Sequence, residues 1–147
     1  MRNVHSAKYV LCLCALVGIL LPAGSVSGAQ RSLYLRLGGK TAIVKVVDQF
    51  VANVAADKRI NKFFAKTNIP HLKQQLVNQI CEASGGPCKY TGRSMKEAHR
   101  GMAIADKDWN ALVEDLVKAM TKLKVPKQEQ NDLLALLGPM KGDIVGQ

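Results

Sequence analysis

Histidine and cysteine are the residue types in this chain that could bind a metal or take part in redox chemistry. Beyond an apolar N-terminal stretch, the 147-residue sequence keeps two of each, His71 and His99 and then Cys81 and Cys88. A neutral imidazole is a good ligand for iron when an acceptor orients its other ring nitrogen. The two histidines are therefore candidate iron ligands, and the two cysteines are candidates for a disulfide.

His99 shares one face of a predicted helix with Met95, Ala98 and Met102. Such soft, apolar neighbours suit the proximal side of a haem. The same spacing also fits a half-buried core histidine that is bonded to a backbone carbonyl. Because a lone histidine specifies no metal, helical spacing alone favours this second interpretation.

Cys81 and Cys88 flank the turn sequence Gly85-Gly86-Pro87. The sequence has no C-x-x-C-H, so covalent attachment of a c-type haem is not supported, and the lack of C-x-x-C argues against a zinc knuckle or a thioredoxin-like pair. A disulfide needs Cα atoms within ~7 Å, which a chain reversal at the two glycines allows. Two free thiols are the alternative. An oxidising compartment favours the disulfide.

Signatures of hydrolases and nucleotide-binding enzymes are missing from the sequence. It contains no G-x-S-x-G, no H-E-x-x-H and no Gly-rich phosphate loop after a strand. Its carboxylates, such as Asp106 and Glu114, fall mostly at predicted helix ends and on polar faces. The sequence therefore gives no support to hydrolytic chemistry.

Residues 1–29 have the three parts of a secretory signal peptide. Arg2 and Lys8 precede an almost wholly apolar run at 9–21, and the small residues Ser27-Gly28-Ala29 follow. The run is shorter than the ~20 apolar residues that a membrane-spanning helix needs. We therefore expect an exported protein of the bacterial periplasm, with no stable membrane span after cleavage of the signal.

The segment 30–147 is long enough for one domain with one core. Taking away Arg2 and Lys8 with the leader lowers the formal net charge from +10 to +8. A surplus of this kind is common in nucleic-acid-binding proteins. Here the basic residues are spread over every segment, without a dense cluster or an aromatic platform, so we expect a solvated basic surface and no nucleic-acid partner.

The elements that position these side chains read as helices, because apolar residues recur every three to four positions. Between 43 and 54, five of the six apolar residues at helical spacing are β-branched and would also suit a strand, but their period indicates a helix; the six are Ile43, Val46, Val47, Phe50, Val51 and Val54. No segment alternates as a strand does, so the predicted fold class is all-α. The expected elements are a short helix at 33–37, a helix at 43–54, a turn-like piece at 59–65, a helix from the N-cap Asn68 to Gly85, a helix at 95–102, a helix at 109–123 and a last helix from Pro126 to Gly138.

Five short motifs follow one another along the chain: Leu33-Tyr34-x-x-Leu37-Gly38-Gly39, Asp48-x-Phe50, Asp57-x-Arg59-Ile60-x-x-Phe63-Phe64, Gly85-Gly86-Pro87 with Tyr90-x-Gly92-Arg93, and Met95-Lys96-x-Ala98-His99. In this order and spacing they resemble the first group of the truncated haemoglobins, and the resemblance spans Ser32 to about Gly146. The C-terminal sequence from Leu137 to Val145 is also similar to an exported subset of that family.

This resemblance implies a two-over-two helix sandwich around haem b, iron protoporphyrin IX. His99 falls on the position of the proximal iron ligand, and Met95 falls on a proximal-side contact. Phe50, Phe63 and Phe64 fall on the aromatic positions that wall the distal side and wedge the ring. Tyr90 falls near the haem propionates.

The chain departs from the family on the distal side. Val51 stands where many members have a tyrosine whose hydroxyl bonds the bound gas, and Leu72 and Leu76 stand where glutamine or histidine is frequent. Gln75 lies between these leucines and is expected to point to the propionates or to solvent. His71 is rotated by about 100° from Leu72 on an ideal helix, so it is expected in solvent and not on the iron.

These departures predict an apolar distal pocket without the usual hydrogen-bond donor to bound dioxygen. Losing such a bond costs roughly 1.5–3 kcal/mol, or about ten- to a hundredfold faster release. We expect a haem-b globin that binds oxygen, NO or CO for transport, storage or sensing, together with an electron-donor reductase. The alternatives are a haem-dependent NO dioxygenase or weak peroxidase, and a haem-free interaction module with the globin fold.

Overall fold

The structure is a computed structural model that describes residues 31–147, so the predicted signal peptide at 1–29 lies outside the described residues. All regular structure in the described part is helical, as the sequence predicts. Six α-helices and two 3₁₀-helices follow one another along it: α1 (Leu33–Arg36), α2 (Gly39–Ala56), η1 (Asn61–Phe64), α3 (Ile69–Ala83), α4 (Met95–His99), α5 (Asp106–Lys122), α6 (Lys127–Leu137) and η2 (Gly138–Asp143).

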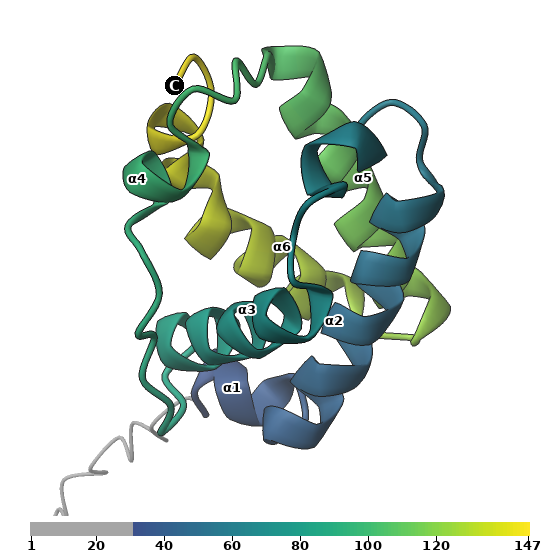
Figure 1. Cartoon of the computed structure of the whole chain (residues 1–147). Helices are drawn as coiled ribbons and strands as arrows, with labels where there is room; N and C mark the ends of the chain where they lie inside the picture. The colour runs from purple at the N-terminus through teal and green to yellow at the C-terminus, as the bar shows by residue number, and fades with distance from the viewer. Residues whose placement is uncertain (1–30) are drawn as a thin grey trace, which may run out of the picture.

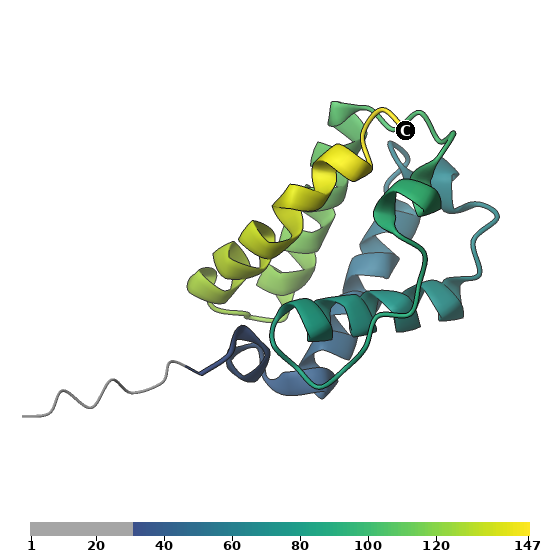
Figure 2. The ribbon, with the colours of Figure 1, turned by 90° about the vertical axis from the view of Figure 1, so that its left-hand side faces the viewer.

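The long helices form two layers. Figure 2 shows α5 and α6 in one layer and α2 and α3 in the other, and α2 is the helix that contacts both α3 and α5. Val47 of α2 and Met120 of α5 are both almost fully buried in this core. The predicted two-over-two sandwich is therefore the observed arrangement.

The apolar period of α2 is explained by its two neighbours. Its buried residues recur at helical spacing and include Ile43, Val46, Val47 and Val54. Apolar area removed from water contributes roughly 25 cal/mol per Å², so burial on two sides outweighs the small strand preference of β-branched residues. The helical interpretation of residues 43–54 is confirmed, although α2 already begins at Gly39.

Two ends of helices differ from the sequence-based expectation. α4 ends at His99 because Arg100 has an extended backbone and Gly101 has φ +75°, so Met102 lies beyond the helix. At the C-terminus the chain does not leave helical geometry at Gly138-Pro139 but continues as η2 to Asp143. Gly138 has helical backbone angles, and Pro139 sits in the first turn of η2, where its missing N–H costs nothing.

The start of α3 is formed as its sequence predicts. The Asn68 side chain accepts a hydrogen bond from the backbone N–H of His71 at 3.0 Å, and proline occupies the first turn. Arg36 of α1 pairs with Glu129 and Asp132 of α6, which fixes the first helix against the last long one. Within residues 31–147 no helix is long and apolar enough to cross a membrane.

Candidate functional site

His99 is the last residue of α4, and its imidazole is half-buried. Its Nδ1 lies 2.7 Å from the carbonyl oxygen of Met95, one helical turn earlier. Because a carbonyl oxygen can only accept, Nδ1 carries the proton and donates it. The neutral ring then keeps an unprotonated Nε2, whose lone pair can bind a metal.

The short helix α4 is stabilised at its start by a capping box. The hydroxyl of Ser94 accepts a hydrogen bond from the backbone N–H of Glu97, and the Glu97 carboxylate accepts from the backbone N–H of Ser94 at 3.1 Å. The Ser94 hydroxyl also donates to this carboxylate, which holds the pKa of Glu97 below its ordinary value. These bonds order the single turn that carries His99.

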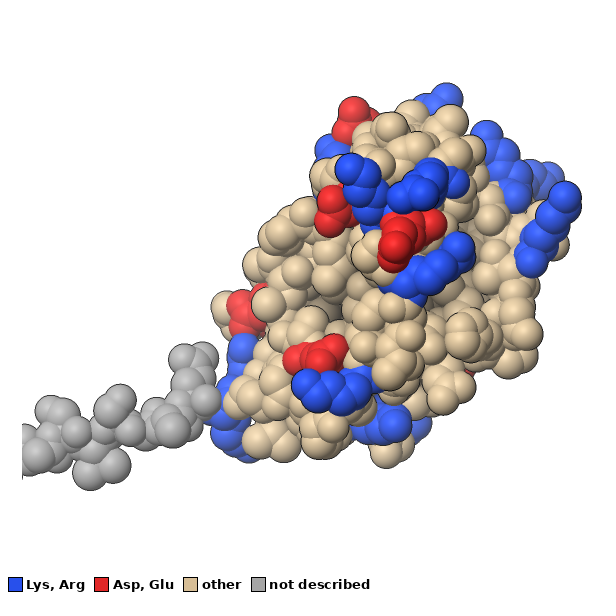
Figure 3. Space-filling model, turned by 60° about the vertical axis from the view of Figure 1, so that its left-hand side comes forward, with Lys and Arg blue, Asp and Glu red and all other residues tan. Residues whose placement is uncertain are grey.

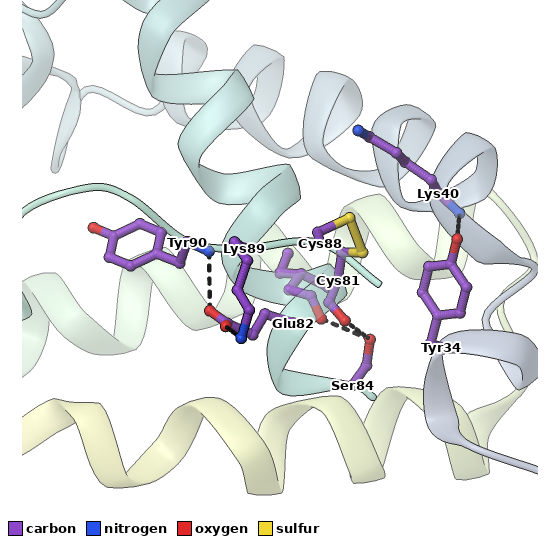
Figure 4. Close-up of a disulfide and its surroundings, with 9 residues drawn as sticks. Tyr34, Lys40, Cys81, Glu82, Ser84, Cys88, Lys89 and Tyr90 are labelled. Carbon is purple, nitrogen blue, oxygen red and sulfur yellow. Dashed lines mark hydrogen bonds and ion pairs between the residues drawn. A yellow bond between two sulfur atoms is a disulfide. The ribbon is translucent and has the colours of Figure 1, made fainter. Parts of the chain in front are cut away.

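The segment from Ser84 to Ser94 connects α3 to α4 and is attached to the end of α3 (Figure 4). Cys81 and Cys88 form a disulfide with a Cα–Cα distance of 5.7 Å. The neighbouring Glu82 accepts hydrogen bonds from the backbone N–H of Tyr90 at 2.9 Å and from Lys89 at 3.2 Å. The first of these bonds, with help from the second, lowers the pKa of Glu82. The disulfide interpretation is confirmed.

Tyr90 lies on this connecting segment and is half-buried. Its hydroxyl donates a 2.6 Å hydrogen bond to the carbonyl oxygen of Arg93, and burial raises the pKa of the phenol. The ring also packs against Gly92, where an added Cβ would lie 2.4 Å from the Tyr90 hydroxyl. Tyr90 therefore stiffens the residues just before α4, and its predicted place near the propionates stays a prediction.

The distal residues predicted from the sequence come from α2, η1 and α3. Phe50 and Val51 of α2 are buried, and Figure 1 shows η1, α3, α4 and the start of α5 arranged around the middle of the molecule. The remaining predicted distal residues are half-buried: Phe63, Phe64, Leu72 and Leu76. His71 is exposed, as the sequence predicts, and stands apart from them.

An apolar cavity of about 220 Å³ lies between α2, α5 and α6. Phe50 is the predicted site residue that lines it. Most of the other lining residues are ones that the sequence period predicts to be in the core. The period cannot separate the two cases, because a helix face that borders a cavity is as apolar as a face that packs against another helix. The lining residues are Phe50, Trp109, Leu112, Val113, Leu116, Leu134, Leu137 and Gly138.

Two glutamines of α3 are polar features of the site: the sequence predicted that Gln75 points to the propionates or to solvent, and it gave Gln79 no role. The amide oxygen of Gln75 is buried without a hydrogen-bond partner among residues 31–147. Gln79 donates to the sulfur atoms of Met95 on α4 and Met140 on η2, each at 3.5 Å. The sequence did contain a signal for Gln79. It follows Leu72 by seven residues, or nearly two helical turns, so both residues lie on the same side of α3.

Comparison with known proteins decides the family. The model of the bacterial-like globin family matches residues 32–145. The chain is 34% identical over 113 residues to the group 1 truncated haemoglobin of Mycolicibacterium paratuberculosis. The matched residues make up 77% of this chain and 83% of that protein. The chain belongs to the group 1 truncated haemoglobins.

Solved structures of the family agree with the observed fold. The Fe(III) form of the truncated haemoglobin from Tetrahymena pyriformis matches this globin with a TM-score of 0.77 at 30% identity, over 80% of this chain and 100% of that one. The 2/2 haemoglobin from Synechococcus sp. PCC 7002, in its cyanomet state with covalently attached haem, matches with a TM-score of 0.74 at 30% identity and the same coverage.

The cofactor of globins is haem b, and the residues of this globin fit it. His99 offers an oriented imidazole with a free Nε2, the form in which histidine binds haem iron. The cavity beside Phe50 has mostly apolar walls, which suits a porphyrin, although neither His99 nor the leucines of α3 line it.

Proposed function

We propose that this globin binds small diatomic gases at a haem iron held by His99, and that it serves in gas transport, storage or sensing. The observation that supports this most is the 2.7 Å hydrogen bond from His99 Nδ1 to the Met95 carbonyl. It selects the tautomer that leaves Nε2 for the iron and fixes the direction of the ring. When bound, haem b supplies the iron atom that takes the gas.

On the distal side, the proposal assigns the space for the gas to Val51, Leu72 and Leu76. Val51 is buried, and both leucines are half-buried on α3. None of the three side chains has a hydrogen-bond donor. They exclude water and offer dispersion contacts, which serve NO and CO as well as oxygen. Bound dioxygen therefore lacks the stabilising hydrogen bond that a donor side chain would give it.

A catalytic role is the less supported proposal. NO dioxygenation or peroxidase chemistry needs a polar group that stabilises charge developing on the bound gas. At the predicted distal positions the chain has Val51, Leu72 and Leu76 instead. We therefore propose a binding protein and not an enzyme, and mixing the aerated ferrous protein with NO tests this: little or no nitrate is expected, whereas rapid nitrate formation would contradict the proposal.

We further propose that the globin is exported to the periplasm after removal of residues 1–29, and that an electron donor keeps its iron reduced there. The disulfide between Cys81 and Cys88 supports an oxidising compartment. Exposed cations on and around α4 offer a docking face for an anionic partner, namely Arg93, Lys96 and Arg100. On the face shown in Figure 3, basic side chains are interspersed with acidic ones. Mass spectrometry of the periplasmic fraction checks whether the chain begins at Gln30.

The test of the main proposal compares two histidine variants. His99→Ala removes the proposed iron ligand, and His71→Ala removes an exposed histidine as the matched control. After titration with haem, the native protein and His71→Ala should give the same Soret bands in the ferric, ferrous and CO-bound forms. His99→Ala should lose the histidine-ligated spectrum and regain it with added imidazole. An unchanged spectrum in His99→Ala would overturn the assignment, and no haem uptake by the native protein would leave a haem-free interaction module.

A further inference from the structure

We propose that Gln79 is a positioning residue for the iron ligand: it holds Met95, and the carbonyl of Met95 in turn orients His99. The Gln79 amide donates to the sulfur of Met95 and to the sulfur of Met140, each at 3.5 Å. It thereby joins three elements, the consecutive helices α3 and α4 and the distant η2. The inference rests on the proposed function, since it takes His99 as the iron ligand.

Gln79 lies on the side of α3 that carries the predicted distal residues. At about 100° per residue, its seven-residue distance from Leu72 brings it within about 20° of the same direction. Its side chain is half-buried and lies between Gln75 and Leu72 around the helix, at the border of the apolar face. A half-buried amide at this border needs hydrogen-bond partners of its own.

The partners of this amide are two flexible side chains. A methionine has three rotatable side-chain bonds and a soft sulfur atom that accepts hydrogen bonds weakly. An amide N–H directed at such a sulfur adds little binding energy but selects one rotamer of the methionine. A leucine at position 79 would fill similar space without this direction. We therefore assign Gln79 to positioning and not to overall stability.

Met95 transmits the position of Gln79 to His99. It is the first residue of α4, and its carbonyl oxygen is the acceptor for the His99 Nδ1–H at 2.7 Å. The helix between them has five residues, so a shift of Met95 moves the acceptor and with it the imidazole. Groups that orient a metal-bound histidine in this way also set its basicity.

The hydrogen bonds of Gln79 to the two methionines lie near the C-terminal end of α3, where the segment that connects α3 to α4 begins. Gln79 precedes Cys81 by two residues, and the Cys81–Cys88 disulfide attaches the connecting segment there. Met140 brings the C-terminal η2 to the same place, where η2 contacts α4. The helix of the iron ligand is thus held from α3 on one side and from η2 on the other.

The experiment uses the haem-loaded mature protein and resonance Raman spectra of its ferrous form. Gln79→Leu removes the amide, and Gln74→Leu, at an exposed position on α3, is the matched control. We expect Gln79→Leu to shift or broaden the iron–histidine stretching band and to transfer haem to excess apomyoglobin several-fold faster. Gln74→Leu should match the native protein in both measurements.

A second pair of variants separates positioning from simple packing. Met95→Leu keeps the backbone carbonyl but removes the sulfur, so it should shift the band as Gln79→Leu does. The double variant should then resemble either single variant, because both substitutions remove the contact between Gln79 and Met95. Met140→Leu, which removes only one of the two acceptors, should give a smaller shift in the same direction, and it carries the test if Gln79→Leu does not fold.

The outcomes distinguish the two levels of the proposal. If the iron–histidine band of Gln79→Leu is the same as that of the native protein, the role of Gln79 is overturned and the proposed function stays intact. The same holds for Met140→Leu if that variant has to replace Gln79→Leu. Additive shifts in the double variant also overturn it. If the native protein shows no iron–histidine band at all, the proposed function fails first, and the role of Gln79 fails with it.

Discussion

The disulfide between Cys81 and Cys88 joins the last turn of α3 to the segment that leads into α4, the helix of His99. The chain between the two cysteines turns at Ser84 and Gly85, and Gly85 has φ +85°. Cys81 is fully buried in the core, so the connecting segment is anchored to a part of the molecule that does not move freely. The position of the proposed iron ligand therefore depends on a covalent bond between two residues that are seven positions apart in the sequence.

Breaking this disulfide is expected to lower the stability of the globin. Closing a loop of this length removes unfolded-state entropy worth about 2.5 kcal/mol, so the Cys81→Ala/Cys88→Ala double variant should unfold at lower urea concentration. Haem should also leave the variant faster, because α4 is less tightly held. Reduction of the native protein is the independent comparison. A native midpoint that does not move on reduction would contradict this expectation.

A hydroxyl placed on the distal side should slow the release of dioxygen. Val51 is buried at 8% exposure, and the resemblance predicts that it stands where many family members have a tyrosine. In Val51→Tyr a bond from the phenol to bound oxygen would contribute roughly 1.5–3 kcal/mol, or about a ten- to hundredfold slower dissociation. Stopped-flow measurement of oxygen release checks this, and Val51→Phe supplies the same bulk without the hydroxyl. Equal rates in the two variants would show that the site is not beside the gas.

The acid stability of the globin should depend on Asp57, which follows α2. Its carboxylate accepts hydrogen bonds from the Arg59 side chain and backbone, and these lower its pKa to about 2. The unfolded value is about 3.9, so this contribution to stability is complete above about pH 4 and is lost as the pH falls through 2.

Urea unfolding between pH 6 and pH 2 checks the role of Asp57. The native protein should lose stability with falling pH more steeply than Asp57→Asn, which has no charge to lose there. Asp143→Asn, at an exposed position, is the control and should follow the native curve. Identical pH dependence of native protein and Asp57→Asn would remove Asp57 from the explanation.

Gly86 should tolerate no side chain, for a reason that concerns space. A Cβ at this position would lie 2.5 Å from a ring carbon of Tyr34 and 2.7 Å from the sulfur of Cys81. We expect Gly86→Ala to destabilise the fold by about 1–3 kcal/mol, measured by thermal or urea unfolding. Gly142→Ala is the matched comparison, because a Cβ there meets nothing within 4 Å. Equal stability of the two variants would mean that the segment can move aside without cost.

The sequence by itself determined the helices, the Asn68 cap of α3 and the family. Apolar period, the Asn68 cap and the Gly85-Gly86-Pro87 stop are local signals, and each concerns residues within one or two turns of one another. His99 needed more than local pattern, because its spacing also suited a core histidine. The ordered set of motifs made it the expected iron ligand, and the cysteine pairing stayed open until the 5.7 Å Cα–Cα distance was known.

The tertiary structure alone decided the ends of helices and the contacts between distant residues. α4 ends at His99 and η2 continues past Gly138, because backbone geometry there answers to packing more than to residue type. Gln79 meets Met95 and Met140, which are 16 and 61 residues away in the chain. Such contacts depend on how helices cross, and the period of each helix contains no information about its neighbour.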